Sequence, residues 1–517
     1  MAPHQACQFC RDAKHIVFME IYIKILPLTQ SIKSSLKYLG LILIFALLLR
    51  LVFFSGADHS DSLLYYTYSH QVADGTFKPT DNHFSSRIGL IYPQGIIYRI
   101  FGVNEFSSNV LSLIISLAGI ILIFCFGKML FSEKAGLVAA FLLSFFPLDV
   151  IFSTRLLPDF PAAFFMALAV FLFLKAEKSD SNVSYFVAGL SWGIAYLIKE
   201  ISILMALFFL VYAIYRKKLR TKYILVGIGF ALLILIELWN AYSLTGNAFY
   251  RHTQIESEEV AYLQETYSNY FTPFGMLSRL LLHWPFLMLH DAHYGLFFIF
   301  IFIALFYCIF KRKESSDILL IWIIALTAYL NFGTLSFRQY IPIPITAKFL
   351  SIIMFPSILI LAYFLSEEDK TIKKFFMPAS LIILLLSSIG FIYLSDERFI
   401  INEAKQAYSF VKNSNMQIYT DERTKMVLDY LSGFKSEGKF IAFNKFDLYS
   451  KSEKNSLVDL RDKHNVLILV NNGMINGLPK LYKDIKFPEQ VSNIPKSWQI
   501  LMEFGSGDKK ISIYYAQ

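Results

Sequence analysis

The sequence predicts a polytopic α-helical membrane protein with a small α/β domain at its C-terminal end. Of the 517 residues, 56% are hydrophobic and 17% are charged, and the mean hydropathy is +0.50. This composition is typical of a chain with many membrane spans and excludes an ordinary soluble protein or a disordered chain. Beyond residue 394 the long apolar runs stop, and short apolar segments alternate with charged ones. That change predicts a separate folded domain.

The N-terminal segment 1–34 is predicted to be cytoplasmic. Cys7 and Cys10 form a CxxC whose spacing is compatible with zinc, while the alternative interpretation is an unstructured extension. Met19 is an alternative start for the chain. The first apolar run lacks a small-residue cleavage site, so we expect it to be retained as a membrane anchor.

Apolar runs recur between residues 36 and 394, where we expect a transmembrane domain over 35–395. A span needs about 20 apolar residues, or fewer where polar residues interrupt it. The run 185–215 is too long for one span, and Lys199 and Glu200 divide it into two. The result is about eleven spans. They are 36–54, 110–126, 135–152, 160–174, the two halves of 185–215, 223–242, 294–310, 318–332, 349–365 and 375–394.

Basic residues precede the first span and then occupy every second connection, which predicts the orientation. They are Lys24, Lys33, Lys128, Lys134, Lys175, Lys178, Arg216, Lys217, Lys218, Arg220, Lys222, Lys311, Arg312, Lys313, Lys370, Lys373 and Lys374. With an odd number of spans all of them lie on one side, which the positive-inside rule makes cytoplasmic. The net charge of +9 is explained by these connections, and no basic groove with interleaved aromatic residues points to nucleic acid.

The opposite, extracytoplasmic side then collects the unusual segments. They include a first loop over 56–109, a large loop over 243–293 and the C-terminal domain over 396–517. Within the large loop, 273–290 is predicted to be a helix in the membrane interface, with Trp284 at the headgroup level. The acidic stretch before it is either a mobile cover or a solvated connection.

The C-terminal domain is predicted to mix strands and helices, as expected for a compact unit of about 120 residues. Apolar and aromatic runs predict strands, and charged periodic stretches predict helices. The expected strands are 417–420, 440–443, 466–470, 498–504 and 511–515, and the expected helices are 403–412 and 422–431.

Asp61, at the mouth of the first span, is the first candidate for a catalytic base. In a helix that starts there, Asp61 and Tyr65 share one face. A carboxylate where a membrane meets water is costly and suggests a function. The alternative is that Asp61 caps the helix. Asp58, in the same loop, is the alternative base.

A second group of charged residues follows later spans. Arg155 and Asp159 stand in STRLLPDFP, where two prolines predict a turn. Asp159 is a second catalytic candidate and Arg155 a phosphate ligand, while an ion pair between the two is the alternative. Lys199 and Glu200 interrupt an apolar run, which is functional by default, although a local ion pair or a snorkelling lysine is the alternative.

Two further arginines are candidates for binding a lipid phosphate. Arg87 belongs to the first loop, and Arg338 stands in FRQYIPIPITAK between two later spans. Both are predicted to lie on the extracytoplasmic side with Asp61.

Several stretches resemble the GT-C superfamily of membrane glycosyltransferases, in particular the protein O-mannosyltransferase-like group, to which the bacterial aminoarabinose transferases are related. They are 61–75, RIGLIYPQGIIYRIFGVNE at 87–105, RLLPDFP at 155–161, GLSWGIAYLIKE at 189–200 and LTGNAFY at 244–250. The resemblance implies inverting transfer of a sugar from a polyprenyl-phosphate carrier to an acceptor hydroxyl on the extracytoplasmic face of the plasma membrane. It implies Asp61 as general base. The candidates for binding the sugar or the lipid phosphate are Tyr65, Arg87, Arg155, Lys199, Glu200 and Arg338. The acceptor is a glycan, a lipid or a protein.

One departure from the family pattern concerns metal binding. The family usually has Asp-Glu in the first loop, where this chain has Asp61-Ser62. Asp61 is then a lone carboxylate, so no metal ligand is assigned, and a divalent metal is compatible with the reaction but not required. The competing functions are a lipid-linked glycan transporter or flippase, which should show internal repeats and broken helix pairs, and a membrane scaffold for the C-terminal domain.

Overall fold

The computed structural model describes most of the chain. The described residues are 32–80, 82–217, 219–255, 272–334, 340–367, 372–395, 400–436, 438–445, 456–461, 463–481 and 485–517. Most of the predicted cytoplasmic segment 1–34, the acidic stretch before residue 272, and Arg338 lie outside them.

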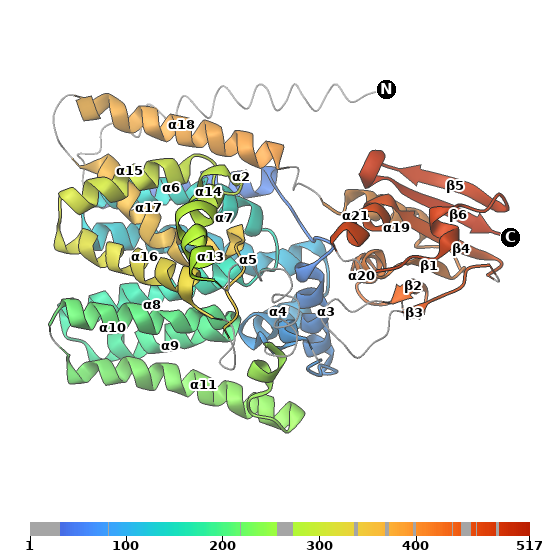
Figure 1. Cartoon of the computed structure of the whole chain (residues 1–517), viewed down its shortest axis with the longest axis horizontal. Coiled ribbons are helices and arrows are strands. Elements are labelled where there is room, and N and C mark those ends of the chain that lie inside the picture. Colours follow the sequence, from blue (N-terminus) through green and yellow to red (C-terminus); the bar gives the residue numbers. More distant parts are fainter. Residues whose placement is uncertain are drawn as a thin grey trace.

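A bundle of long helices forms one end of the molecule and a sheet domain forms the other (Figure 1). Among the described residues, 7 helices are long and apolar enough to cross a membrane, and three shorter apolar helices accompany them. The long helices are α2 (Ile32–Val52), α5 (Glu105–Leu130), α8 (Asp159–Ser179), α11 (Ile224–Thr245), α16 (Glu314–Phe332), α17 (Ser351–Ser366) and α18 (Ile372–Leu394). The shorter ones are α9 (Asn182–Ile198), α10 (Met205–Tyr215) and α15 (Phe297–Phe310). Each coincides with a predicted span.

The predicted span 135–152 is not one helix. It is broken into α6 (Glu133–Ser144) and α7 (Pro147–Phe152). Pro147 has no backbone N–H and therefore cannot continue the hydrogen-bond ladder of the preceding helix. The break turns the chain within the bundle instead of carrying it straight across.

Arg50 of α2 stabilises this break from inside the bundle. The Arg50 side chain is completely buried and donates hydrogen bonds to the carbonyl oxygens of Ser144 and Ala46, each at 2.9 Å. It also pairs with the carboxylate of Asp149 in α7. A helix end leaves carbonyl oxygens without partners, and Arg50 supplies a donor to one of them.

The predicted interfacial helix 273–290 is helical, but its tryptophan is placed differently from the prediction. It consists of α13 (Pro273–Ser278), the π-helical turn η5 (Arg279–His283) and α14 (Trp284–His290). Trp284 is buried in the bundle core rather than at the headgroup level, while Phe274 and Phe286 are exposed. The helix therefore presents its phenylalanines, and not its tryptophan, to the surroundings.

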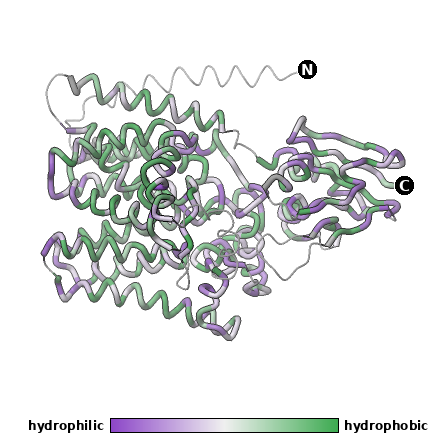
Figure 2. Tube along the Cα trace, in the orientation of Figure 1, coloured by the Kyte–Doolittle hydropathy of each residue, from purple (hydrophilic) through white to green (hydrophobic). Residues whose placement is uncertain are grey.

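The basic connections gather at the end of the bundle that is farthest from the sheet domain (Figure 1). Contacts between them confirm that they share this end. Lys178 donates to the carbonyl oxygen of Met129 at 2.8 Å, and Lys313 pairs with Glu367 at 3.0 Å. Figure 2 shows the apolar residues concentrated along the helices, with polar residues at the two ends of the bundle and in the sheet domain.

The C-terminal domain contains the predicted strands and helices, together with elements that the sequence did not predict. Its strands are β1 (Ile418–Asp421), β2 (Phe440–Lys445), β3 (Ser456–Leu457), β4 (Val466–Asn471), β5 (Trp498–Phe504) and β6 (Ile511–Ala516). They form a 6-stranded sheet in the order β3-β2-β1-β4-β6-β5, in which β1 is parallel to β2 and β4. Helices α19 (Asn402–Val411), α20 (Glu422–Leu431) and α21 (Asn472–Leu481) accompany it. The two-residue β3 and α21 were not predicted.

Between the bundle and the sheet domain lies the first loop, which contains α3 (Asp61–Asp74), the turn η1 (His83–Ser86) and α4 (Ile88–Phe101). The largest cluster of buried apolar residues lies inside the bundle, and the second largest lies beside it. The second core joins α3 and α4 to the C-terminal domain. The first loop therefore packs with the C-terminal domain although more than 300 residues of sequence separate Leu63 from Val427.

Candidate active site

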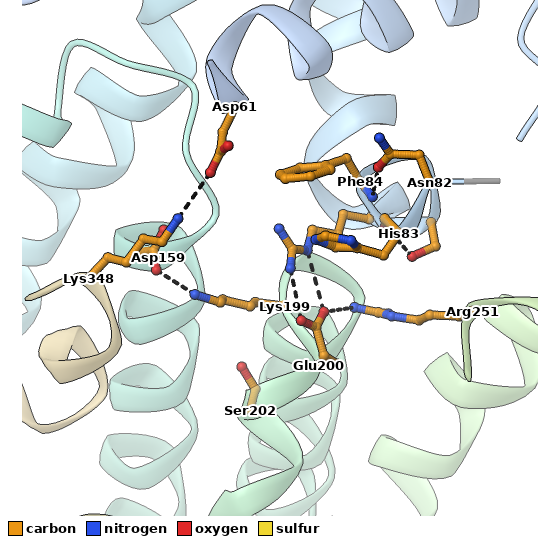
Figure 3. A network of polar contacts seen from close by, with 12 residues as sticks. Asp61, Asn82, His83, Phe84, Asp159, Lys199, Glu200, Ser202, Arg251 and Lys348 are labelled. Carbon is orange, nitrogen blue, oxygen red and sulfur yellow. Dashed lines mark hydrogen bonds and ion pairs between the residues drawn. The ribbon is translucent and has the colours of Figure 1, made fainter. Parts of the chain in front are cut away.

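Asp61 is the first residue of α3, and the turn before it is held by Asp58. The Asp58 carboxylate accepts hydrogen bonds from the Ser60 backbone N–H at 2.9 Å and from the Ser62 hydroxyl at 2.8 Å. The N-cap residue is Ser60, so the alternative in which Asp61 caps the helix is wrong. Asp58 is engaged in the turn, which leaves Asp61 as the carboxylate that extends toward the bundle (Figure 3).

Asp61 pairs with Lys348, which is 287 positions away in the sequence. The Lys348 ammonium lies 3.0 Å from Oδ2 of Asp61 and belongs to the turn η6 (Ala347–Leu350) that leads into α17. Burial by itself raises the pKa of Asp61, but the charge and hydrogen bond of Lys348, with help from Arg87 and Ser60, outweigh it. The net effect is a lowered pKa, which keeps this carboxylate ionised.

Asp159 and Lys199 form a second ion pair next to the first. Asp159 begins α8, and Lys199 follows the last residue of α9. Their charged atoms lie 2.5 Å apart with exposed fractions of 2% and 6%, and the Lys199 ammonium lies 4.4 Å from the ring centre of Phe349. The alternative in which Lys199 pairs locally with Glu200 is wrong, because the two side chains bind different partners.

Glu200 holds two arginines. Its carboxylate lies 2.8 Å from Arg87 and 3.0 Å from Arg251, and Arg87 also donates to the Tyr65 hydroxyl. Arg251, which follows α11, reaches Glu237 of that helix at 3.5 Å. Four segments of the chain thus meet where Arg87, Glu200, Arg251 and Glu237 alternate in charge. We refer to these residues, together with the pairs Asp61–Lys348 and Asp159–Lys199, as the charged row.

The close approach of α4 to α9 allows Arg87 to reach Glu200. A Cβ atom on Gly89 would lie 2.8 Å from backbone atoms of Leu197 and Ile198. Glycine is needed where two backbones come this close, since no other residue fits without displacing one of them. The glycine two positions after Arg87 therefore sets the spacing of the two charged residues.

Arg155 and Arg338 are the two remaining arginines among the sequence candidates. Arg155, on the loop between α7 and α8, is buried with its guanidinium 5.9 Å from the ring centre of Phe152. Arg338 lies outside the described residues. His83, also named in Figure 3, is buried, and burial together with Arg87 lowers its pKa to about 3, so it is neutral at physiological pH.

An apolar cavity of about 480 Å³ adjoins the charged row. It lies between α4, α5, α8, α9 and α11, and its lining residues include immediate sequence neighbours of Arg87 and Lys199. The lining residues are Ile88, Gly89, Leu90, Tyr92, Pro93, Leu111, Ile115, Pro161, Phe165, Ile194, Leu197, Ile198, Ile236 and Asn240. The charged row and the cavity together can hold a molecule with an anionic head and an apolar tail.

Three residues of the row were not among the sequence candidates. Lys348 and Arg251 stand at the edges of apolar runs, where basic residues are common, so the sequence carries no signal that distinguishes them. Glu237 lies inside an apolar span, and the rule that selected Glu200 would have found it. Within the described part of the chain, no three His, Cys, Asp or Glu side chains gather in a way that could hold a metal ion.

A matching family model and similar solved structures relate this chain to known proteins. A family model described as dolichyl-phosphate-mannose-protein mannosyltransferase matches residues 88–239, a range that contains Asp159, Lys199 and Glu200 but begins after Asp61 and Arg87. A search of curated proteins finds no match.

Solved structures of two proteins are similar over nearly the whole chain. ArnT from Cupriavidus metallidurans bound to undecaprenyl phosphate matches with a TM-score of 0.60 and 12% identity, covering 92% of this chain and 98% of that chain. The oligosaccharyltransferase AglB from Archaeoglobus fulgidus, in complex with an inhibitory peptide and a dolichol-phosphate, matches with a TM-score of 0.52 and 13% identity, covering 94% and 74%. In the form tethered with an acceptor peptide, the coverage is 78% of this chain and 63% of that chain.

At these identities the structural likeness shows the fold. The comparisons confirm the predicted GT-C fold and the resemblance to the protein O-mannosyltransferase-like group. Together with the long apolar helices, they show an integral membrane protein.

Proposed function

We propose that this protein is a membrane glycosyltransferase that moves a sugar from a polyprenyl-phosphate carrier to an acceptor hydroxyl, with inversion at the anomeric carbon. The observation that carries the proposal is the row of charged residues beside an apolar cavity between five helices. A lipid phosphate has the same division into an anionic head and an apolar tail. The family model names dolichyl phosphate, and the similar structures hold undecaprenyl phosphate or a dolichol-phosphate.

Asp61 is the general base in this proposal. It accepts the proton of the acceptor hydroxyl while the acceptor oxygen attacks the anomeric carbon from the face opposite the phosphate. The bond between that carbon and the phosphate oxygen breaks at the same time, with oxocarbenium character at the sugar. The pair with Lys348 keeps Asp61 ionised and ready to accept the proton, since its pKa is lowered.

Arg87 and Arg251 bind the departing phosphate. The two guanidinium groups converge on Glu200, which fixes their positions before the donor binds. Charge-assisted hydrogen bonds from arginine stabilise the negative charge that grows on the phosphate as it leaves. A phosphate leaves readily, so the reaction needs no strong general acid.

Asp159, the second catalytic candidate, acts together with Lys199. Their pair lies beside Lys348, and the charge of Asp159 acts on that lysine. Asp159 therefore helps to hold the two ammonium groups next to the base. Arg155, on the loop before α8, adds another cation near the phosphate.

The reaction is proposed to take place on the extracytoplasmic side of the plasma membrane. The basic connections gather at the opposite end of the bundle, and basic connections are retained in the cytoplasm. Asp61, the first loop and the C-terminal domain are then extracytoplasmic.

The test is sugar release by the purified protein in nanodiscs from a panel of polyprenyl-phosphate hexoses, pentoses and amino sugars. Glycan, lipid and protein fractions of the cell envelope serve as acceptors. We expect one donor to be consumed by the wild type and spared by Asp61→Asn, while the control Asp459→Asn, an exposed aspartate of the C-terminal domain, retains activity.

Two outcomes would contradict the proposal. Equal activity of the wild type and Asp61→Asn would show that Asp61 is not the general base. Absence of donor turnover, with lipid-linked glycan crossing vesicle membranes instead, would establish the transporter alternative.

A further inference from the structure

Helix α3 has two functional faces. Asp61 and Tyr65, four residues apart, lie on the face that contacts Lys348 and Arg87. Tyr66 and His70, also four residues apart, lie on a second face that contacts the C-terminal domain. A rigid helix transmits a displacement of one face to the other, so anything that moves the second face also moves Asp61.

Two aromatic stacks join the second face of α3 to the end of α20. The Tyr66 and Tyr430 rings lie 4.9 Å apart between centroids with an interplanar angle of 16°. The His70 and Phe434 rings lie 4.6 Å apart at 11°. Stacks in succession along one helix fix both its position and its rotation about its own axis.

The stacks are embedded in a shared hydrophobic core. Leu63 and Tyr66 of α3 belong to the same buried cluster as Val427, Leu428 and Tyr430 of α20. This cluster is separate from the core of the bundle. The helix that begins with Asp61 is therefore held by the C-terminal domain over one face, and by charged contacts with the bundle over the other.

The backbone of Phe434 is strained in a way that supports this role. Its φ angle is +58°, in the left-handed region that a bulky side chain avoids, and it follows Gly433 at +66°. The Phe434 N–H donates to the carbonyl oxygen of Asp429 at 2.8 Å, which closes the end of α20. A second glycine or an asparagine would suit this turn better. Phenylalanine at this position therefore costs backbone strain, and its ring stacks on His70.

Both ends of the first loop are held by the same domain. Lys405 of α19 lies 2.5 Å from Glu105, the first residue of α5, and the Ile400 N–H donates to the carbonyl oxygen of Ser55 at 3.4 Å. The segment that contains Asp61 is thus attached to the C-terminal domain both before and after that residue.

We infer that the C-terminal domain positions Asp61, with Tyr430 and Phe434 as positioning residues, and that it is a part of the catalytic unit rather than a separate module. This inference rests on the proposed function only for its effect on the rate. The structural part of the inference, that Phe434 restrains α3, does not depend on any enzymatic activity.

The experiment compares Phe434→Asn with Phe434→Tyr in the full-length protein. Asparagine tolerates the left-handed backbone but removes the stack, while tyrosine preserves the stack and the strain. The control is Phe410→Asn, which removes a different aromatic contact of the same domain, the edge-to-face pair of Phe410 with Phe504 at 6.4 Å between ring centroids. The readouts are the thermal midpoint, hydrogen–deuterium exchange over 61–74, and kcat and KM for the lipid donor.

We expect Phe434→Asn to keep or raise the thermal midpoint, to speed exchange in α3, and to lower kcat about tenfold with KM changed less than twofold. Phe434→Tyr should behave as the wild type, and Phe410→Asn should leave the exchange in α3, kcat and KM unchanged. If Phe434 had a purely structural role, Phe434→Asn would lower the thermal midpoint and would not change kcat separately from KM.

Two results would overturn the inference, and they differ from failure of the proposed function. Unchanged exchange in α3 of Phe434→Asn would show that the stack does not restrain the helix. Equal losses in Phe434→Asn and Phe434→Tyr would show that the stack is not the cause. If the wild type transfers no sugar, the proposed function fails, while the exchange measurement still decides whether the domain holds α3.

Discussion

Replacement of Lys199 by methionine should destabilise the protein strongly, because it leaves the Asp159 carboxylate buried without its partner. In the wild type the two charged atoms lie 2.5 Å apart with exposed fractions of 6% and 2%. Methionine has nearly the length of lysine and keeps the contact with Phe349, so the change removes mainly the charge.

The magnitude follows from the burial of the pair. Removing one partner of a buried ion pair costs about 3–5 kcal/mol, whereas replacing both partners by apolar residues is often nearly neutral. Lys348 lies close enough to Asp159 to compensate for part of the lost charge, so we expect the lower end, about 3 kcal/mol, for Lys199→Met. The double variant Lys199→Met/Asp159→Leu should lie within about 1 kcal/mol of the wild type.

The assay is reversible denaturant unfolding in detergent micelles, followed by circular dichroism, for both single variants and the double variant. Lys178→Met serves as control, because Lys178 is an exposed lysine of α8, the helix that begins with Asp159, and should change stability by less than about 0.5 kcal/mol. Additive effects of the two single changes would refute the reasoning. They would show that Asp159 and Lys199 are solvated in the membrane-embedded protein and do not depend on each other.

Three further predictions concern the remaining charged residues. Burial raises the pKa of Asp61 and the charge of Lys348 lowers it, so Lys348→Met should raise that pKa. The acid limb of the kcat–pH profile should then move to higher pH, and an unmoved limb would exclude Asp61 as the titrating base. Arg251→Lys keeps the charge but loses the forked geometry, and we expect KM for the lipid donor to rise about tenfold, with an unchanged KM arguing against a phosphate contact. Burial raises the pKa of Asp421 from 3.8 to about 6, so the stabilisation from its protonated form is present below pH 3.8 and is lost as pH rises through about 6. Asparagine preserves the helix cap but does not titrate. Asp421→Asn should therefore reduce the change in the free energy of unfolding over this pH range by about 3 kcal/mol, and parallel stability–pH curves for variant and wild type would contradict this prediction.

The fold could be predicted from the sequence to a large extent, because its main signals are local. Each apolar run long enough for a span is helical, with the run 135–152 divided into two helices, and the basic connections share one end of the bundle. Five strands of the C-terminal domain, all except β3, also stand where the sequence predicts them. The break at Pro147 was missed, since apolar length alone does not distinguish a straight helix from a turn whose free carbonyl oxygen is bound by Arg50.

The candidate site could be predicted only as a set of residues. Asp61, Arg87, Asp159, Lys199 and Glu200 are unusual in their local context, and the structure brings all of them to one end of the bundle. Their proposed roles were inferred from the residues and from the resemblance to a family, and they remain predictions.

The partners of these residues were decided by the tertiary structure. Lys199 binds Asp159 and not the adjacent Glu200, and Asp61 binds Lys348, which is 287 positions away in the chain. Hydropathy and periodicity describe each segment by itself, and they determine which segments become helices and which side chains are exceptional. A charge buried beside a membrane binds the opposite charge that helix packing brings within about 3 Å, and that packing depends on contacts between segments distant in sequence.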